Sequence, residues 1–456
     1  MRYERRVVVN PILKALYRLY RFLSAIWRWV VRRFTPAGLV VLVAVLAAGM
    51  MGPDTENNVA YQAFTLLLFL LLVAVSFCVF FRARFDAGRA LPRFGTVGQP
   101  FHYTVTVQNR SSRVQSGLTL LDDLEDPRPS FSEWRAVQLA AGREARSFRF
   151  SQRQRLHPFR VATVNEAPVP IVRPNEECEV NVQIMPLRRG LLRFKGVTFA
   201  RPDPLGLFRG FVKVPSPQTA LILPKRYVLP PIALPGTMKY QEGGVALASS
   251  VGQSEEFVAL RDYRRGDPLR HIHWRSWAKT GEPVVKEFED EFFVRHALVL
   301  DTFTAEVRSE VFEEAISVAA SFACAVRTQE SLLDLLFVGP ESYCFTAGRG
   351  LAHADQMLEI LAAVRRCEEK TFGSLEHLVL NHIKAVSGCI CVLLAWDQER
   401  MEFVKKIRLL GLPVLVLVIT SPRANQELDP GPMRDDPGRF HVLQVGSIEQ
   451  GLAKLY

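Results

Sequence analysis

Two uncharged apolar runs near the N-terminus dominate the pattern of hydrophobic and polar positions. Pro36–Gly52 carries no charge over 17 residues, and Val59–Phe81 carries none over 23. A helix needs roughly 20 apolar residues to cross the hydrocarbon core of a bilayer. The pattern therefore predicts a two-helix transmembrane hairpin over residues 36–81 that places the chain in a lipid bilayer.

Basic residues flank this pair of runs on both outer sides. Residues 1–35 hold nine Arg or Lys against one acid, Glu4, and arginines follow the second run at positions 82, 84, 89 and 93. The connecting residues 53–58 (PDTENN) contain two acids and no base. Positive charge favours the cytoplasmic side, so both termini and the body are predicted to be cytoplasmic, in a bacterial inner membrane. The long basic stretch and the second run argue against a cleaved signal peptide.

The first 35 residues form a basic amphipathic segment. Apolar side chains recur at helical spacing, and the bases share the other face; the apolar set is Ile12, Leu16, Leu19, Leu23, Ile26, Val30 and Phe34. Two readings stay open: a helix that lies on an anionic membrane surface, or a positive flank that only sets topology. The segment supplies +8 of the net charge of +11, so the body has no basic character that would indicate a nucleic-acid partner.

From residue 94 to residue 230 short alternating runs replace the apolar ones. Phe101–Asn109 alternates apolar and polar side chains and ends at a turn. Similar runs follow at Leu118–Leu121, Ala145–Phe150, Arg160–Val164, Cys178–Met185, Leu192–Phe199 and Thr219–Leu223. Short strands separated by turn residues predict an Ig-like β-sandwich. Residues 231–253, with Gly243 and Gly244, are predicted to be a linker.

Residues 254–293 are dense in charge and aromatic rings. Between Glu256 and Glu289 lie seven Arg or Lys, two Trp and six carboxylates. Asp267 and Pro268 predict a helix start, so a helix is expected over residues 268–279, ended by Gly281. Arg270, Trp274 and Trp277 would share one of its faces, and Pro283–Glu289 is a predicted strand. Glu287 and Glu289 would then reach Arg261, Arg270 or Arg275.

Three interpretations of this element stay open: a structural ion-pair network, a partner-binding surface, or a catalytic site. His271 and His273 would point apart on the predicted helix, so they predict no metal site. His273 is expected to pack beside Trp274 or to bond a carboxylate.

The order of residues here resembles the bacterial family known as domain of unknown function 58. Leu260, Arg261, Tyr263, Gly266, Asp267, Arg270, Ile272 and Trp274 follow the pattern L-R-x-Y-x-x-G-D-x-x-R-x-I-x-W, and Val285, Glu287, Phe288 and Glu289 follow V-x-E-F-E. Upstream, Arg188–Gly190 and Asp203–Phe208 resemble the family's R-R-G and D-P-F-G-L-F elements. The resemblance implies a protein partner, a MoxR-type AAA+ ATPase that assists complex assembly.

Residues 294–456 alternate continuous apolar runs with helical patterns. The predicted strands are Arg295–Asp301, Leu332–Val338, Ile390–Ala395, Leu412–Ile419 and Arg439–Val445, and the predicted helices are Glu306–Gln329, His353–Arg366, Ser374–Val386 and Gln398–Leu410. Apolar strands alternating with helices predict a doubly wound α/β sheet.

This domain resembles a von Willebrand factor A-like domain, whose metal site uses D-x-S-x-S after the first strand and a later Asp. Asp301, Thr304 and Asp397 are the degenerate candidates here, because Phe303 and Ala305 replace the two serines. Mg²⁺ requires hard oxygen ligands, so we expect no Mg²⁺ cofactor. Asp301 would instead cap a helix or bond backbone amides.

Seven scattered cysteines with no C-x-x-C pair predict reduced thiols in a cytoplasmic protein. Cys389 and Cys391 would point to one face of a strand.

Three classes of function follow from these features. The first is a non-enzymatic, membrane-anchored scaffold that exposes its two soluble domains to protein partners. The second is a hydrolase that uses carboxylates and His273, although no nucleophile elbow, P-loop or H-E-x-x-H motif is present in the sequence. The third is a divalent-cation-dependent adhesion module.

Overall fold

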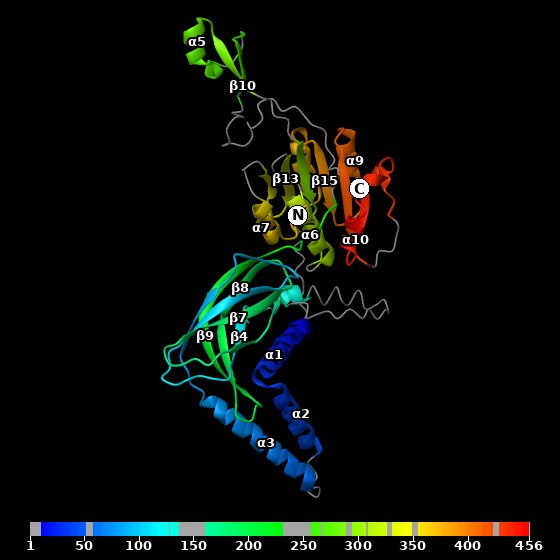
Figure 1. Cartoon of the computed structure of the whole chain (residues 1–456). Helices are drawn as coiled ribbons and strands as arrows, with labels where there is room; N and C mark the ends of the chain where they lie inside the picture. Colours follow the sequence, from blue (N-terminus) through cyan, green and yellow to red (C-terminus); the bar gives the residue numbers. More distant parts are fainter. Residues whose placement is uncertain are drawn as a thin grey trace. The chain divides into compact units, whose positions relative to one another are not determined.

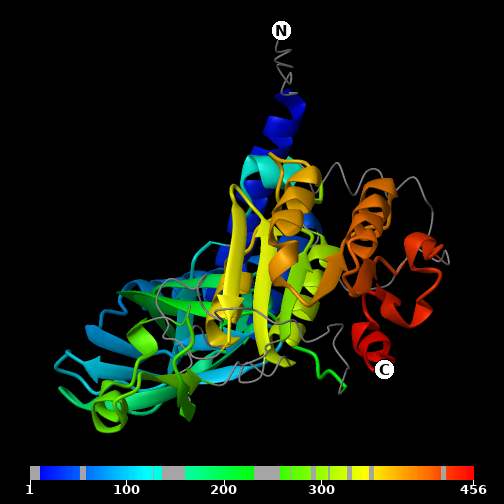
Figure 2. The same ribbon diagram turned by 90° about the horizontal axis from the view of Figure 1, so that it is seen from above.

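The computed structural model describes residues 11–51, 58–126, 128–135, 160–230, 257–265, 267, 269–288, 294–306, 309–325, 331–348, 354–422 and 428–455. The chain forms two compact units, Met1–Lys225 and Arg226–Tyr456, and each is described by itself. Figure 1 and Figure 2 show the elements of both units in sequence colours.

Three helices open the first unit: α1 (Pro11–Arg33), α2 (Pro36–Met51) and α3 (Asn58–Val79). Among the described residues, one helix is long and apolar enough to cross a membrane, over Val59–Val79. Helix α2 has 16 residues, so its length is about 24 Å at ~1.5 Å per residue, against roughly 30 Å for a hydrocarbon core. Length and composition therefore support the predicted span over Val59–Phe81. They do not support the predicted span over Pro36–Gly52.

The loop that carries the D-P-L-G-L-F residues packs against these helices. Asp203 holds the loop in shape, because its Oδ1 accepts hydrogen bonds from the backbone N–H groups of Leu207 (2.7 Å) and Phe208 (2.6 Å). Phe208 then packs edge-on against Phe34, with ring centroids 5.0 Å apart. The hydroxyl of Thr35 donates to the carbonyl of Gly206 at 2.5 Å. The loop thus joins the β-sandwich to the α1–α2 junction.

Two sheets form the β-sandwich. The first has the order β1 (Phe85–Ala90), β3 (Phe101–Asn109), β7 (Glu177–Pro186), β5 (Ala162–Val164). The second has the order β2 (Phe94–Thr96), β9 (Arg209–Leu223), β8 (Gly190–Pro202), β4 (Leu118–Leu124), β6 (Ala167–Val169). Side chains from both sheets form one apolar core, to which β3 gives Tyr103, Val105 and Val107. The predicted strand over residues 145–150 lies outside the described residues.

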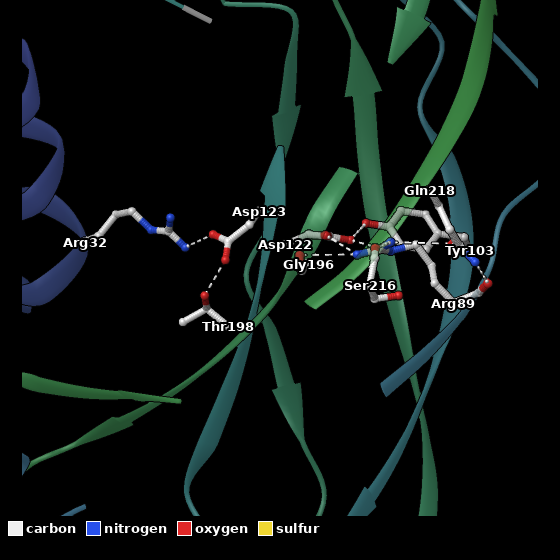
Figure 3. Close-up of polar contacts among 9 residues, drawn as sticks. All are labelled: Arg32, Arg89, Tyr103, Asp122, Asp123, Gly196, Thr198, Ser216 and Gln218. Atoms are coloured by element: carbon white, nitrogen blue, oxygen red, sulfur yellow. Dashed lines mark hydrogen bonds and ion pairs between the residues drawn. The ribbon is translucent and has the colours of Figure 1, made fainter. Parts of the chain in front are cut away.

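Strand β1 lies before residue 94, where the apolar pattern placed the start of this domain. The pattern missed it because one of its inward positions holds Arg89, which is buried. The Arg89 guanidinium forms a bidentate pair with Asp122 of β4, at 2.6 and 3.1 Å. The hydroxyl of Tyr103 also donates to Asp122, and Figure 3 shows this cluster between the sheets.

The neighbouring Asp123 points to the other side of β4 (Figure 3). Its carboxylate lies 2.6 Å from the guanidinium of Arg32 on α1, and it accepts a hydrogen bond from the hydroxyl of Thr198 at 2.5 Å. Successive strand residues face opposite sides of a sheet. One strand therefore places one carboxylate in the core and the next one against α1.

The second unit holds a six-stranded sheet with the order β14 (Ser342–Ala347), β13 (Ser331–Val338), β12 (Val294–Leu300), β15 (Gly388–Leu393), β16 (Val414–Thr420), β17 (Phe440–Gln444). Five of these strands are parallel, and β14 pairs antiparallel with β13 at one edge. Chain order reverses between β12 and β15, so this is a doubly wound sheet with its switch point there. Edge strand β14 was not predicted.

The described helices of this unit that accompany the six-stranded sheet are α6 (Glu310–Ala325), α7 (Ala354–Ala363), α8 (Gly373–His382), α9 (Gln398–Leu409) and α10 (Ile448–Leu452). The described part of the second unit also contains the 3₁₀ turns η1 (Leu269–His271), η2 (Ile383–Ala385), η3 (Gly431–Met433) and η4 (Pro437–Arg439). Helix α6 starts later than predicted, because the Ser309 hydroxyl accepts from the Phe312 amide and caps the helix there.

Helices α8 and α9 cover one face of the sheet. They pack Leu375, Phe403 and Ile407 against alternate strand residues that include Cys389 and Cys391. The two cysteines are fully buried and share that face, with sulfur atoms 3.5 Å apart. Helix α6 contacts β12, β15 and β16, and its buried side chains belong to the opposite face. Apolar layers on both faces explain why these strands have continuous apolar sequences.

Candidate functional site

The signature residues fold into a small element of their own. Strands β10 (Phe257–Asp262) and β11 (Val284–Phe288) form a two-stranded antiparallel sheet. The 3₁₀ turn η1 and helix α5 (Trp274–Thr280) connect them. Helix α5 ends at Gly281, whose φ of 77° and N–H bond to the Trp277 carbonyl confirm the predicted stop.

The predicted helix over residues 268–279 is wrong in its first half. The helix begins at Trp274, with His273 at its N-cap position. Asp267 does not cap it, because both oxygens of its carboxylate bind the Arg261 guanidinium, at 2.7 and 2.9 Å. The same carboxylate accepts from the amide of Arg264 at 2.7 Å. These hydrogen bonds lower the pKa of Asp267 to about 2.

Arg261 therefore pairs with the carboxylate of Asp267. The expected reach of Glu287 and Glu289 to Arg261, Arg270 or Arg275 stays a prediction. Glu287 pairs by backbone register with Ala259. Gly266 and Glu289, and the side chains of Arg270 and Glu287, lie outside the described residues. Tyr263 joins the element through its amide, which donates to the Pro283 carbonyl at 2.9 Å.

Little of this element is buried. Its described buried side chains are Ile272, Val284 and Val285, and α5 buries none. The ring of Trp274 stacks on that of Trp277 at 5.2 Å and remains 63% exposed, while Leu269 is 67% exposed. Four basic side chains of the element are exposed too: Arg264, Arg265, Arg275 and Lys279. We call this group the signature surface: Arg264, Arg265, Leu269, Trp274, Arg275 and Lys279.

A second candidate site lies at the carboxyl end of β12, beside the switch point of the sheet. Asp301 follows β12 and is fully buried. Its Oδ1 accepts from the Phe303 amide at 2.9 Å, and its Oδ2 accepts from the Leu394 amide at 3.1 Å. The expectation that Asp301 bonds backbone amides therefore agrees with the geometry.

The strongest partner of Asp301 is Arg400, in the first turn of α9. Its Nε donates to Asp301 at 2.7 Å, and its other nitrogens pair with Asp397 at 2.5 Å and with the Phe303 carbonyl at 3.4 Å. The guanidinium also lies 4.8 Å from the centre of the Phe372 ring. Burial raises the pKa of the Asp301 carboxyl, and Arg400 opposes that rise.

These residues do not fit a divalent metal ion. A permanent positive charge on Arg400 already lies between Asp301 and Asp397. Thr304 is also engaged, because its hydroxyl accepts from the Glu306 amide at 3.2 Å. Among the described residues, no group of three His, Cys, Asp or Glu side chains is arranged to hold a metal. An open groove of about 540 Å³ remains beside Arg400, lined in part by Phe303, Arg366 and Lys370.

The sequence interpretation missed Arg400. Its one local signal is the spacing Asp397-x-x-Arg400, which is also common for a surface pair on a helix. Its contact with Asp301 joins residues 99 positions apart, and no local pattern reports such a contact. Likewise, no sequence pattern indicated that Asp267 would bind Arg261 and that His273 would occupy the N-cap position of the helix.

The described residues define a class of protein that has a helix of membrane-spanning length, a β-sandwich and a doubly wound α/β unit. A family model described as protein of unknown function DUF58 matches residues 259–434. The uncharacterized protein YeaD of Bacillus subtilis (strain 168) is 31% identical over 132 residues, which are 28% of this chain and 32% of that protein. Residues 259–434 of this chain are therefore similar to the DUF58 family.

The chain spans about a third of the length of that curated relative (32%). Among solved structures, the CARDB domain of a Pyrococcus furiosus protein matches with 10% identity and a TM-score of 0.16, over 31% of this chain and 94% of that one. Salmonella alpha-2-macroglobulin reacted with methylamine matches with 12% identity and a TM-score of 0.19, over 36% and 9%. We draw no conclusion from likenesses at these TM-scores.

Proposed function

We propose that this chain is a membrane-anchored, non-enzymatic interaction protein whose docking site is the signature surface. The observation that carries the proposal is the exposure of Trp274 and Leu269 in a small element whose described basic side chains are mostly exposed as well. Tryptophan and arginine are the side chains that most often dominate binding energy in protein interfaces. An element with three buried apolar side chains would hardly need such a surface for its own folding.

The partner is a protein with an acidic surface and an apolar pocket. Residues 257–288 hold seven basic and four acidic side chains, and Asp267 is already neutralised by Arg261. The exposed charge is therefore positive, which favours encounter with an acidic partner and makes that encounter sensitive to salt. A MoxR-type AAA+ ATPase, the partner implied by the family resemblance, is our candidate.

The anchor is α3, and we propose that α2 enters the bilayer with it as a hairpin. Large apolar side chains are exposed on both helices, among them Val40, Val43, Leu66 and Phe69. Lipid would cover these side chains. The basic residues of α1 and the arginines after α3 would then lie on one side, which keeps both termini and both soluble units in the cytoplasm.

A native pull-down from membranes tests the docking site. Trp274→Ala, and separately Arg264→Glu with Arg265→Glu, should each reduce recovery of the ATPase by about tenfold or more, since hot-spot truncation costs about 2 kcal/mol or more. Leu409→Ala is the matched control, because Leu409 is an exposed apolar residue on α9. Equal recovery with wild type, Trp274→Ala and Leu409→Ala would rule out the signature surface.

One contact favours the hydrolase alternative. His273 Nδ1 lies 2.7 Å from the hydroxyl oxygen of Ser276, the kind of pair that activates a nucleophile. The carboxylate of Asp267 binds the Arg261 guanidinium through both oxygens, so it is not available to orient that histidine. Loss of a hydrolytic activity in Ser276→Ala, with docking retained, would favour the enzyme over the scaffold.

A further inference from the structure

Helix α1 is fixed to the β-sandwich along one face. Arg28 pairs with Asp126 at 2.7 Å, and Arg32 pairs with Asp123 at 2.6 Å (Figure 3 shows the second pair). Near the start of the helix, the hydroxyl of Tyr17 donates to the Pro129 carbonyl at 2.8 Å. The ring of Tyr17 also lies 5.6 Å from that of Trp134. Basic and aromatic side chains of α1 thus contact protein.

Between Leu19 and Trp29, the opposite face of α1 is an apolar stripe. A helix turns by about 100° per residue, so Arg28 lies about 200° around the axis from Ile26. The side chains around Ile26 are all exposed: Leu19, Phe22, Leu23, Ile26, Trp27 and Trp29. Phe22 and Trp27 reach 63% and 65% exposure. Six large apolar side chains on one face form a patch of a kind that soluble monomers rarely leave in water.

We propose that this stripe lies in the headgroup region of the bilayer, so that α1 is an interfacial helix that seats the β-sandwich on the membrane. The inference rests on the membrane anchoring proposed above and adds a lipid-binding surface to it. Continuity of the chain supports the proposal, because only Phe34 and Thr35 lie between the end of α1 and the start of α2. Phe34 packs in one cluster with Leu71 and Ala74 of the membrane-spanning helix.

Charge indicates the lipid. Arg18 lies at the edge of the stripe nearest Phe22, about 40° from it on a helix of ~100° per residue, and its side chain is exposed. Basic side chains at this position bind anionic headgroups, and tryptophan prefers the membrane interface. The occupant is therefore the surface of an anionic phospholipid leaflet rather than a second protein chain.

Quenching of tryptophan fluorescence by brominated lipids tests the proposal on the full chain. The chain is reconstituted in phosphatidylcholine–phosphatidylglycerol vesicles, with bromine near either the carbonyl end or the middle of the acyl chains. We expect stronger quenching by bromine near the carbonyl end, and loss of most of that quenching in the variant Trp27→Phe with Trp29→Phe. Trp274→Phe with Trp277→Phe is the matched control and should retain it.

Equal quenching of wild type and the Trp27/Trp29 variant, in vesicles from which carbonate does not extract the protein, would overturn the interfacial helix and leave the anchor intact. If a second copy of the chain, rather than lipid, covered Trp27 and Trp29, the wild type and the variant would also be quenched equally. Extraction by carbonate would instead overturn the anchor and the interfacial helix together. A thermal unfolding midpoint of the variant equal to that of wild type shows that the changed quenching is not misfolding.

Discussion

The Nε atom of Arg400 lies 2.7 Å from a carboxylate oxygen of Asp301, so an arginine of α9 neutralises the carboxylate that ends β12. The pair is shielded from water, with side-chain exposures of 7% and 0%. The position where the sequence resemblance implied a weakened metal site therefore carries an internal ion pair. That pair fixes α9 to the carboxyl edge of the sheet.

Arg400→Met should lower the stability of the second unit by about 3–5 kcal/mol, because it leaves Asp301 as a buried charge without its partner. Thermal or urea unfolding of the full chain in detergent measures the change. Arg434→Met is the matched control: its pair with Asp429 is exposed on both sides, so the loss should be about 0–1 kcal/mol. The double variant Asp301→Leu with Arg400→Met should recover most of the stability, and its failure to do so would contradict this account.

The Arg89–Asp122–Tyr103 cluster predicts a graded response in the sandwich. Tyr103→Phe removes one hydrogen bond to Asp122 and keeps the ion pair, so the loss should be about 1.5–3 kcal/mol. Arg89→Met removes the ion pair in which both side chains are fully buried, and the loss should be about 3–5 kcal/mol. Unfolding curves of the two variants are compared directly. A larger loss for Tyr103→Phe than for Arg89→Met would contradict the ranking.

Gly38→Ala should separate the D-P-L-G-L-F loop from α2. A Cβ at this position would lie 1.9 Å from the backbone oxygen of Leu207, which is part of a hydrogen-bonded loop and cannot move aside freely. We expect a loss of about 1–3 kcal/mol, as for other overpacked sites. Gly49→Ala, in the same helix, meets only the flexible ring of Phe64 at 3.2 Å and should be much milder. Near-UV circular dichroism and the unfolding midpoint distinguish the two.

The contact between α1 and the sandwich should survive mild acid. Burial alone would raise the pKa of Asp126, but hydrogen bonds from Arg128 and Arg28 outweigh it and hold that pKa well below its ordinary value. A carboxyl with a lowered folded pKa stabilises the fold above its unfolded pKa of about 3.9. That stabilisation is lost as pH falls from about 3.9 toward the lower folded pKa.

The difference in unfolding midpoint between wild type and Asp126→Asn should therefore stay constant from pH 8 to about pH 5 and shrink below about pH 3.9. Asp86→Asn is the control, because Asp86 and its partner Arg110 are both exposed. A difference that shrinks already at pH 6 would mean that Asp126 does not carry the contact.

Two substitutions in the signature element should differ in their effect on proteolysis. Arg261→Met removes the partner of Asp267 and should loosen the turn between β10 and α5, which limited proteolysis of the full chain would detect as faster cleavage within residues 257–288. Trp274→Ala removes an exposed ring and should leave the cleavage rate close to that of wild type. Faster cleavage in both variants would favour a purely structural role for the signature surface.

Period-2 and helical patterns predicted most elements correctly, because the residues they count face a single apolar core. Strand β3 over Phe101–Asn109 matches its prediction residue for residue. The sequence pattern did not predict strand β14, because it is an edge strand with mostly exposed side chains and no regular apolar alternation. It did not predict strand β1, because the buried Arg89 occupies an inward position where an apolar side chain is expected.

The candidate sites were harder to predict than the fold. Candidate residues were recognised by type, but their partners depend on contacts between distant positions. Asp301 finds Arg400 only when β12 and α9 meet at the sheet edge. The apolar stripe of α1 was visible in the sequence as an amphipathic pattern. The contacts of its basic face with Asp123 and Asp126 of the β-sandwich became visible only in the structure.

The adjacent carboxylates of Asp122 and Asp123 also specify how β4 aligns with its neighbours. A shift of β4 by one residue in one direction would set Leu121 opposite Arg89 and leave a buried guanidinium without a counter-charge. A shift in the other direction would set Leu124 opposite Arg32 and release α1. One-residue slips exchange the two faces of a strand, so only the native alignment satisfies both the core and the contact with α1. Asp122 and Asp123 therefore stabilise the correct pairing of β4 and the correct attachment of α1 at the same time.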